Sequence, residues 1–315
     1  MGMLTSFDEL ITTVASQPFR RVAVAAANDP TLVAALKQAV DKNMAVPVFV
    51  GNRDEILAHA SEFGLSLMTD QVLDFPDDLE AAREAVRLVR DGACDILMKG
   101  QIHTDDFLRA LLDKDAGLRS GNAMSHVFVV EAPAGDRLIF VTDAAMNIAP
   151  DVIRKAEIIL NAVYLANVFG FEHPTVAAVA AVELVNPAMP ATLDAAALAK
   201  MSDRGQFPNC VVDGPFGFDN AVSLAAAKQK KITSPVAGKA DILLVPDIEA
   251  GNMLVKCYSH LAGGKTAGVL VGATAPVVLT SRADSVEAKL LSIAASVLMV
   301  NMHRSGKLKV GRMHY

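Results

Sequence analysis

The chain has 315 residues, a formal net charge of −6 at pH 7, no tryptophan and a hydrophobic fraction of 52%. At one domain per ~150 residues, this length predicts about two domains, and the negative charge argues against a nucleic-acid-binding surface. No uninterrupted apolar stretch reaches the ~18 residues of a membrane helix, and the start lacks the order of a secretory signal. We therefore expect a soluble, cytoplasmic protein with aliphatic cores.

Short apolar runs alternate with helical patterns in the first third of the chain. Strands are predicted at 21–27, 46–50 and 94–98, and helices at about 29–42, 53–63, 77–91 and 105–112. Such βα alternation is typical of a mainly parallel sheet with helices on both faces.

The pattern changes in the middle of the chain. Apolar runs at 126–131 and 137–142 are joined by a turn of hairpin length, so antiparallel strands are expected there. A helix should follow from about 149 to 169, with Pro150 at its first position. Further strands are predicted at 175–180, 210–213, 241–245 and 267–280, and a last helix at about 285–302. Gly272 and Pro276 break the run at 267–280, which predicts two strands or a crossing between domains.

The cysteines and the tail carry weaker signals. Cys94, Cys210 and Cys257 are far apart and form no CxxC pair, so buried apolar positions are expected rather than a disulfide or a zinc site. The basic tail from His303 to Arg312 is interpreted as a solvated terminus, with a helper patch for a phosphate-rich ligand as the alternative.

Polar residues gather where several predicted strands end. Ser281 and Arg282 stand where the strand at 267–280 gives way to a helix, and helix N-termini and arginine forks both bind anions. An ordinary capping box between Ser281 and Asp284 explains these residues equally well.

A second junction follows the strand at 241–245. Asp247 is placed to cap the next helix, and Gly251 allows a ligand to approach the backbone closely. Asn252 and Lys256 are four residues apart, so they share one helical face and offer an amide and a positive charge to the same anion. Here we favour a functional interpretation.

A third junction follows the strand at 94–98. Lys99 and Gly100 suit contact with phosphate or pyrophosphate, and Thr104 is predicted to cap the following helix. His103 is more typical of a structural or surface histidine than of a general base.

A fourth cluster places Asp213 at a predicted strand end and Asp219 at a helix start, where metal ligation and turn chemistry are equally good explanations. Other motifs fail: the glycine that a P-loop requires before Gly264 is Ser259, and no G-x-G-x-x-G follows the first strand. Neither a G-x-S-x-G elbow nor an H-E-x-x-H helix is present, so a hydrolase triad has no basis.

Taken in order, these clusters resemble the phosphate acetyl/butyryltransferase family over nearly the whole chain. The matching segments are MKGQIHT at 98–104, VTDAAMN at 141–147, VNPAMPAT at 185–192, VDGPFGFDNAVS at 212–223, VAGKADILLVPDIEAGNMLVK at 236–256 and GATAPVVLTSRADS at 272–285. The wording of VNPAMPAT and SRADS is closer to the butyryl branch than to the acetyl branch.

The resemblance implies reversible transfer of a short acyl group between coenzyme A and inorganic phosphate, by direct attack of the CoA thiolate on acyl phosphate. Coenzyme A or acyl-CoA and phosphate or acyl phosphate are then substrates, and no separate cofactor, metal, nucleic acid or membrane is expected. The implied fold is similar to that of isocitrate and isopropylmalate dehydrogenases, with two three-layer α/β/α domains and a cleft between them. Residues 1–125 with 272–315 would form the first domain and 126–271 the second, commonly in a homodimer.

The family motifs also imply roles for single residues. Ser281 would donate a hydrogen bond to the acyl carbonyl oxygen, and Arg282 would bind the phosphate. The further implied substrate-binding residues are Gly251, Asn252, Lys256, Lys99, Gly100, His103 and Thr104.

One position departs from the acetyl branch. Ala288 stands seven residues after Ser281, where that branch has an aspartate proposed to take the thiol proton. Glu287 and Asp284 are the nearest replacements, with His103 behind them, although one step along a helix turns a side chain by ~100°. Two other classes stay open: a hydroxyacid dehydrogenase of the same architecture, and a non-catalytic sensor of CoA or acyl phosphate.

Overall fold

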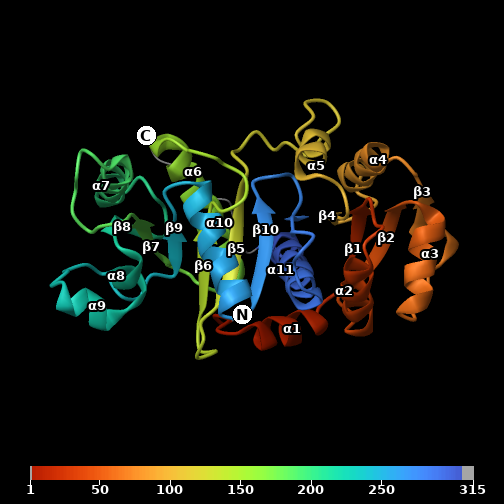
Figure 1. Cartoon of the computed structure of the whole chain (residues 1–315), viewed down its shortest axis with the longest axis horizontal. Coiled ribbons are helices and arrows are strands. Elements are labelled where there is room, and N and C mark those ends of the chain that lie inside the picture. The colour runs from red at the N-terminus through yellow and green to blue at the C-terminus, as the bar shows by residue number, and fades with distance from the viewer. Residues whose placement is uncertain (1, 307–315) are drawn as a thin grey trace. The chain divides into compact units, whose positions relative to one another are not determined.

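The computed structural model describes residues 2–306, which divide into two compact units (Figure 1). The first unit consists of Phe7–Asn122 and Thr266–Ser305, and the second is built around Ala123–Lys265. The chain thus leaves the first unit after Asn122 and returns to it at Thr266. Most of the basic tail singled out in the sequence lies outside the described residues.

The N-terminal residues depart from the expected domain division. The residues up to Ser6, which were expected in the first domain, belong to the second unit. There the Leu4 N–H donates to the Phe169 carbonyl oxygen at 2.9 Å, and Leu4 is 5% exposed. These contacts anchor the start of the chain before α1 (Phe7–Ala15) begins the first unit.

The sheet of the first unit has the strand order β3-β2-β1-β4-β11-β10. Neighbouring strands pair in parallel, except that β10 and β11 are antiparallel. The strands are β1 (Arg20–Ala25), β2 (Ala45–Gly51), β3 (Val72–Asp74), β4 (Ile96–Lys99), β10 (Thr266–Val271) and β11 (Val277–Val278). Gly272 follows β10 with a φ of +96°, which a side chain rarely allows, so the apolar run at 267–280 forms two strands.

The helices of the first unit follow from the strand order. The chain moves outward from β1 to β3 and then returns to β4, so right-handed crossovers place α2 and α3 on one face and α4 on the other. In agreement, α2 packs against α11, whereas α4 packs against β1 and α5. Their bounds are α2 (Pro30–Asp41), α3 (Arg53–Glu62), α4 (Asp78–Arg90), α5 (Thr104–Leu111) and α11 (Val286–Arg304), with a 3-10 turn η1 (Thr69–Gln71) before β3.

Within the second unit the strands follow the order β5-β6-β9-β7-β8. The predicted hairpin is the antiparallel pair β5 and β6, and the remaining neighbours are parallel. The strands are β5 (Ser125–Glu131), β6 (Leu138–Thr142), β7 (Thr175–Val179), β8 (Val211–Phe216) and β9 (Ile242–Leu244). The helices are α6 (Val152–Val168), α7 (Pro190–Asp203), α8 (Phe218–Val222), α9 (Leu224–Gln229) and α10 (Ile248–Lys256), which continues into a π-helical turn, η2 (Cys257–Leu261).

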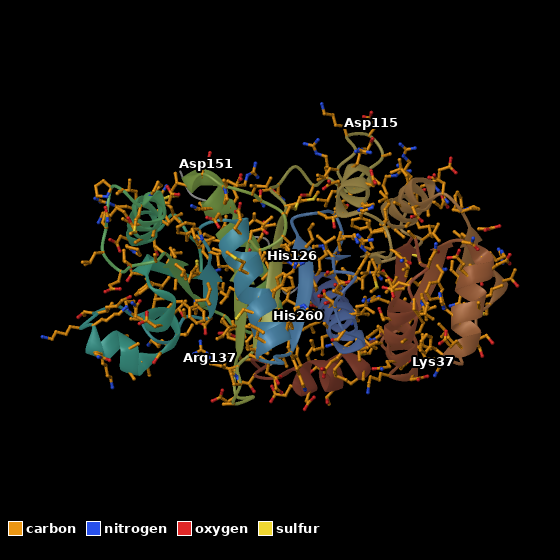
Figure 2. The ribbon with its side chains drawn as sticks, viewed as in Figure 1. Lys37, Asp115, His126, Arg137, Asp151 and His260 are labelled. Atoms are coloured by element: carbon orange, nitrogen blue, oxygen red, sulfur yellow. The ribbon has the colours of Figure 1, made fainter. Side chains whose placement is uncertain are left out.

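The predicted α/β class is confirmed, but several local predictions are wrong. Pro150 does not begin α6: Asp151 is its N-cap and accepts a hydrogen bond from the Arg154 N–H at 2.7 Å (Figure 2). Helices α1, α7 and α9 and strand β3 were not predicted, whereas α8 begins where Asp219 was expected to start a helix. The helix α7 lacks a strong signal because only Thr192, Ala195 and Leu198 of its fourteen residues are buried.

The cysteine prediction holds only in part. Cys94 is buried, and burial raises the pKa of its thiol to about 11. Cys210 is partly exposed and Cys257 is exposed. Cys257 directly follows α10, at the start of the π-helical turn η2, so the expected burial is wrong for this residue.

Helix α11 is long and apolar enough to cross a membrane by length and composition, although 67% of the relevant window is buried inside the protein. Most of its apolar side chains are buried, and Ile293, Val297 and Leu298 have no exposed surface. This helix packs against β10, β11 and α2, as a core helix does.

Candidate functional site

Three strands of the first unit end at one edge of its sheet. Lys99 pairs with Ala25 of β1, and the residue before it, Met98, pairs with Val278 of β11. The loop that follows β11 therefore starts level with Lys99. The structure thus brings the Ser281–Arg282 pair to the same sheet edge as Lys99, as expected for the carboxyl ends of neighbouring parallel strands.

Gly100 lets strands β1 and β4 end in close contact. Its N–H donates to the Ala25 carbonyl oxygen at 2.8 Å, and the Gln101 N–H donates to the Ala26 carbonyl oxygen at 2.8 Å. A Cβ atom at Gly100 would lie only 2.2 Å from the Ala26 oxygen. The packing of two strand ends therefore requires glycine here, and a contact between Gly100 and substrate stays a prediction.

Ser281 and Asp284 brace the turn between β11 and α11. The Ser281 N–H donates to the Asp284 carboxylate at 2.7 Å, and the Asp284 N–H donates to the Ser281 carbonyl oxygen at 3.1 Å. The Ser281 hydroxyl accepts from the Ala283 N–H at 3.3 Å. Because that bond uses an Oγ lone pair, the hydroxyl proton stays available for donation to a ligand. The capping interaction predicted from the sequence is present, but it closes the turn, and α11 itself begins after Ser285.

Arg282 projects from this turn into solvent. Its side chain is exposed and, among residues 2–306, has no hydrogen-bonding or ion-pair partner. A guanidinium without a carboxylate is ready to bind a phosphate through two parallel hydrogen bonds.

Lys99 adds a buried positive charge to the same edge. It is 4% exposed, and its Nζ atom makes one long hydrogen bond, at 3.3 Å, to the Gly100 carbonyl oxygen. Burial, followed by repulsion from Arg282 and Lys289, lowers the pKa of Lys99 from 10.5 to about 8, against smaller effects of Asp29 and Asp284. A weakly paired ammonium near two other cations favours an anionic ligand.

Lys289 was not singled out in the sequence, yet it is one of the most buried charged residues in the structure, at 1% exposure. Its Nζ atom donates to the Thr31 hydroxyl at 2.8 Å and to the Asp284 carbonyl oxygen at 2.8 Å, and it lies 3.6 Å from an Asp29 carboxylate oxygen. The sequence did contain one signal for its burial. Lys289 and Ser292 are three residues apart, so both lie on the same face of α11, among the apolar residues of that helix.

The other candidates for catalysis lie at helix starts. The Ala288 N–H donates to the Ser285 hydroxyl, which caps α11, and Glu287 is exposed in the first turn of that helix. His103 and Thr104 are exposed at the start of α5. Thr104 does not cap α5, since His103 occupies the N-cap position and its side chain makes no capping bond. This corrects the prediction for Thr104.

In the second unit, α10 holds the three predicted binding residues. Asp247 caps this helix through its side chain, as predicted. The Asn252 Nδ2 atom donates to the Ala144 carbonyl oxygen at 3.2 Å, and a Cβ atom at Gly251 would lie 2.9 Å from that of Ala144. Lys256 is exposed at the end of the helix.

A buried aspartate that sequence reasoning passed over holds the loop next to α10. Asp143 is 2% exposed, and its carboxylate accepts from the Ala145 and Met146 N–H groups at 3.0 Å and from the Asn147 side-chain amide at 2.6 Å. These bonds fix the loop that presents Ala144 to Asn252. Asp143 lies within the segment VTDAAMN that resembles the family, but the sequence alone did not indicate that its carboxylate organises the loop.

In the fourth predicted cluster, hydrogen bonds and an ion pair within the protein account for both aspartates, Asp213 and Asp219. Asp213 lies inside β8 rather than at its end, and its carboxylate accepts from the Gly214 N–H at 2.8 Å and from the Ser234 hydroxyl. Asp219 forms an ion pair with Lys230 at 3.1 Å. Across residues 2–306, no group of three His, Cys, Asp or Glu side chains is placed to hold a metal ion.

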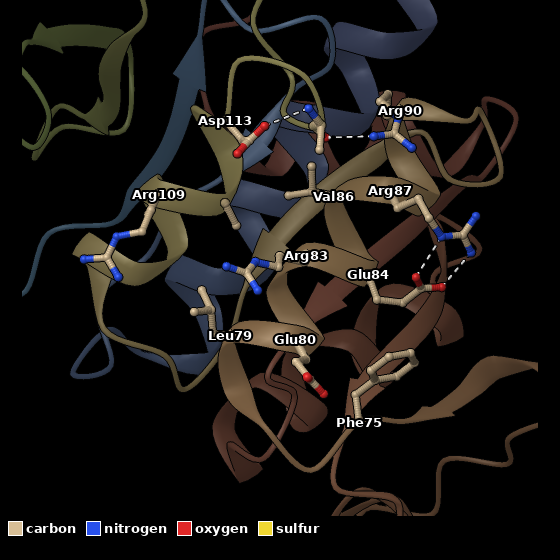
Figure 3. Close-up of a pocket in the computed structure, with 12 residues that line it drawn as sticks. Phe75, Leu79, Glu80, Arg83, Glu84, Val86, Arg87, Arg90, Arg109 and Asp113 are labelled. Carbon is tan, nitrogen blue, oxygen red and sulfur yellow. Dashed lines mark hydrogen bonds and ion pairs between the residues drawn. The ribbon is translucent and has the colours of Figure 1, made fainter.

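An arginine-rich pocket, which the sequence did not predict, lies between α4 and α5 (Figure 3). It has a volume of about 610 Å³. Arg87 pairs with Glu84 at 2.6 Å, and the Arg90 guanidinium donates to the Ala116 carbonyl oxygen at 3.2 Å. Arg83 points toward the centre of the pocket in this view. Acidic side chains thus offset much of the positive charge.

Comparisons with known proteins agree with this geometry. The family model described as "Phosphate acetyl/butaryl transferase" matches residues 77–297. A phosphate butyryltransferase from Clostridium acetobutylicum is 47% identical over 94% of this chain and 99% of its own length, and a phosphate acetyltransferase from Thermotoga maritima is 46% identical over 93% and 99%.

A solved structure gives the same result. The branched-chain phosphotransacylase from Enterococcus faecalis V583 is 34% identical, with a TM-score of 0.78 over 90% of this chain and 99% of that one. The family model covers most of the described residues, including the strand-end clusters that carry Lys99, Asn252 and Arg282. The chain therefore belongs to the phosphate acetyl/butyryl transferase family.

Proposed function

We propose that this protein catalyses the reversible transfer of a short acyl group between coenzyme A and inorganic phosphate. The observation that carries the proposal is the unpaired Arg282 beside the Ser281 hydroxyl, at a sheet edge where Lys99 is buried. This cationic edge lies within a chain 47% identical to a phosphate butyryltransferase.

In the direction of acyl-CoA formation, the CoA thiol loses its proton and the thiolate attacks the carbonyl carbon of the acyl phosphate. A carbon–sulfur bond forms, the bond between the carbonyl carbon and the phosphate oxygen breaks, and phosphate leaves with the electron pair. No residue becomes acylated, so alignment of the substrates and stabilisation of charge supply the rate enhancement.

The turn between β11 and α11 has the groups that this reaction needs. The Ser281 hydroxyl, whose oxygen already accepts from the Ala283 N–H, donates to the carbonyl oxygen as negative charge develops there. Arg282 binds the phosphate group with its fork of N–H donors. At the same sheet edge, Lys99 adds a positive charge that attracts the phosphate, and Gly100 allows the ends of β1 and β4 to pack closely.

The acceptor of the thiol proton is assigned to one of the two carboxylates beside Ser281. Asp284 accepts a hydrogen bond from the Ser281 N–H through one carboxylate oxygen, and Glu287 is exposed in the first turn of α11. Asp284→Asn keeps an oxygen that can accept from the Ser281 N–H but removes the basic carboxylate. Glu287→Gln likewise replaces the other carboxylate with a neutral amide. The variant that loses the acidic limb of the pH–rate profile identifies the acceptor.

The remaining predicted residues are proposed as substrate contacts. Gly251, Asn252 and Lys256 of the second unit offer an amide and a positive charge, and His103 and Thr104 are exposed at the start of α5. We also propose that the protein is a cytoplasmic homodimer, as family members commonly are. Light scattering of the purified protein measures the oligomeric state.

The acyl chain is short, and mixed specificity is proposed. Identity does not separate the acetyl from the butyryl enzyme, because this chain is 46% identical to one and 47% identical to the other. One methylene changes discrimination by only ~1–3 kcal/mol. Turnover of acetyl, propionyl and butyryl phosphate under the same conditions ranks the substrates.

The decisive experiment follows thioester formation from CoA and each acyl phosphate. The proposal predicts turnover by the unmodified protein and a loss of roughly 100-fold or more in Arg282→Ala. Tight CoA binding without turnover would establish a sensor, and substrate-dependent reduction of a nicotinamide cofactor would establish a dehydrogenase. Lys37→Met, at a partly exposed lysine of α2, is the control for nonspecific effects of removing a cation (Figure 2).

A further inference from the structure

Lys289, on α11, links the start of α2 to the turn between β11 and α11. From α11, its Nζ atom contacts Thr31 and Asp29 at the start of α2, and the carbonyl oxygen of Asp284 in the turn that carries Ser281 and Arg282. The Thr31 hydroxyl, in turn, donates to Asp29 at 2.8 Å. The lysine therefore joins the turn to a hydrogen-bonded helix cap.

The turn has few other attachments to the rest of the unit. The hydrogen bonds between Ser281 and Asp284 and between Ser281 and Ala283 are internal to the turn. Such bonds fix the shape of the turn but not its position relative to α2 and the strand ends. Ser281 and Arg282 are both exposed, so core packing of their side chains does not hold the turn in place.

We propose that Lys289 is a positioning residue for acyl transfer: it holds the Ser281–Asp284 turn against the start of α2 and so sets where Ser281 and Arg282 meet the substrate. The proposal rests on the acyltransferase function. Lys289 itself does not touch the substrate, since it is 1% exposed and its ammonium contacts Thr31 and Asp284 inside the protein.

The location of Lys289 also explains why a lysine is used. A long side chain from the second turn of α11 is needed to reach α2, and an ammonium has three donors for the Thr31 hydroxyl, the Asp284 carbonyl and the Asp29 carboxylate. Methionine has a similar length and no donors, so Lys289→Met removes the three contacts with little change in volume.

The first test measures amide hydrogen exchange in the peptide that covers the turn. In Lys289→Met, exchange in this peptide should rise several-fold relative to the unmodified protein, while peptides in β1 and β2 keep their protection. Lys37→Met, the same substitution at a partly exposed α2 lysine that pairs with Asp41, is the matched control and should leave exchange in the turn unchanged.

The second test is a double-mutant cycle with Arg282→Ala. Lys289→Met alone should lower kcat by roughly 100-fold, the effect of a displacement of about 1 Å at a reacting centre. If Lys289 acts through the turn, Lys289→Met should cost less in the Arg282→Ala background than in the unmodified protein, because one of the two groups that Lys289 positions is already absent. Equal losses in both backgrounds would overturn the proposal.

A conservative variant keeps the test meaningful if Lys289→Met does not fold. Thr31→Val removes only the hydroxyl that accepts from Lys289, and it should raise exchange in the turn and lower kcat by a smaller factor. Unchanged exchange and unchanged kcat in Thr31→Val would refute the role of this link. If the unmodified protein shows no acyl transfer, the proposed function fails, whereas the exchange measurement still decides whether Lys289 holds the turn.

Discussion

Replacing Lys99 by methionine should make the protein more stable at neutral pH and less active. The ammonium of Lys99 is 4% exposed and makes one hydrogen bond at 3.3 Å. Burial and the nearby Arg282 and Lys289 lower its pKa from 10.5 to about 8. The folded protein therefore bears the cost of burying a charge that the unfolded chain keeps in water.

The size and sign of the effect follow from the two pKa values. Each unit is worth about 1.36 kcal/mol, so the difference between 10.5 and about 8 costs the folded protein about 3 kcal/mol below pH 8. Between pH 8 and 10.5 the unfolded chain binds more protons at this site, so the contribution of Lys99 to stability rises with pH in that window. Lys99→Met removes the charge and should gain most at pH 7.

Denaturant unfolding at pH 7.0 and pH 9.5 measures this directly. Lys99→Met should be more stable by up to about 3 kcal/mol at pH 7.0, and this advantage should shrink by about 2 kcal/mol at pH 9.5. Lys37→Met removes a partly exposed lysine that pairs with Asp41, and it is the matched control for this comparison. A Lys99→Met protein that is less stable at pH 7.0, or whose advantage does not change with pH, would refute the reasoning.

Three further predictions concern single positions. Ser281→Ala should lower kcat by ~10²–10³-fold with little effect on stability, whereas Ser285→Ala should cost about 1 kcal/mol of stability through loss of the α11 cap and keep its kcat; kinetics and melting of both variants decide. Gly100→Ala should fail to fold stably or lose activity, because its Cβ atom would lie 2.2 Å from the Ala26 oxygen, and a melting temperature equal to that of the unmodified protein would contradict this packing. A thiol reagent should label the exposed Cys257 rapidly and leave the buried Cys94 unmodified until the protein unfolds, as mass spectrometry can show.

The sequence predicted the alternation of strands and helices well, because buried parallel strands produce continuous apolar runs. It also predicted an anion site at the junction after β11, because a hydroxyl and an arginine that follow an apolar run can be recognised from the order of residues alone. It did not reveal which side chains lie beneath that junction. Lys289 reaches Thr31 and Asp29 across more than 250 positions of the chain, and such a contact depends on how α11 packs against α2.

Helix caps were a second source of error. Thr104 and Pro150 satisfied local rules, but the structure begins each helix one or two residues away from the predicted position, because His103 and Asp151 occupy the N-caps. The arginine-rich pocket between α4 and α5 was not predicted because its residues come from two helices and the loop after them. Resemblance to a family identified the chemistry, while the buried supports of the site required the fold.

The central claim is that the Ser281–Arg282 turn transfers an acyl group to phosphate. The most direct measurement is phosphate-dependent release of free CoA thiol from butyryl-CoA and acetyl-CoA by the unmodified protein and by Arg282→Ala. The account predicts release that saturates with phosphate in the unmodified protein and falls by roughly 100-fold or more in the variant. Equal release by both proteins, or release that does not depend on phosphate, would contradict it.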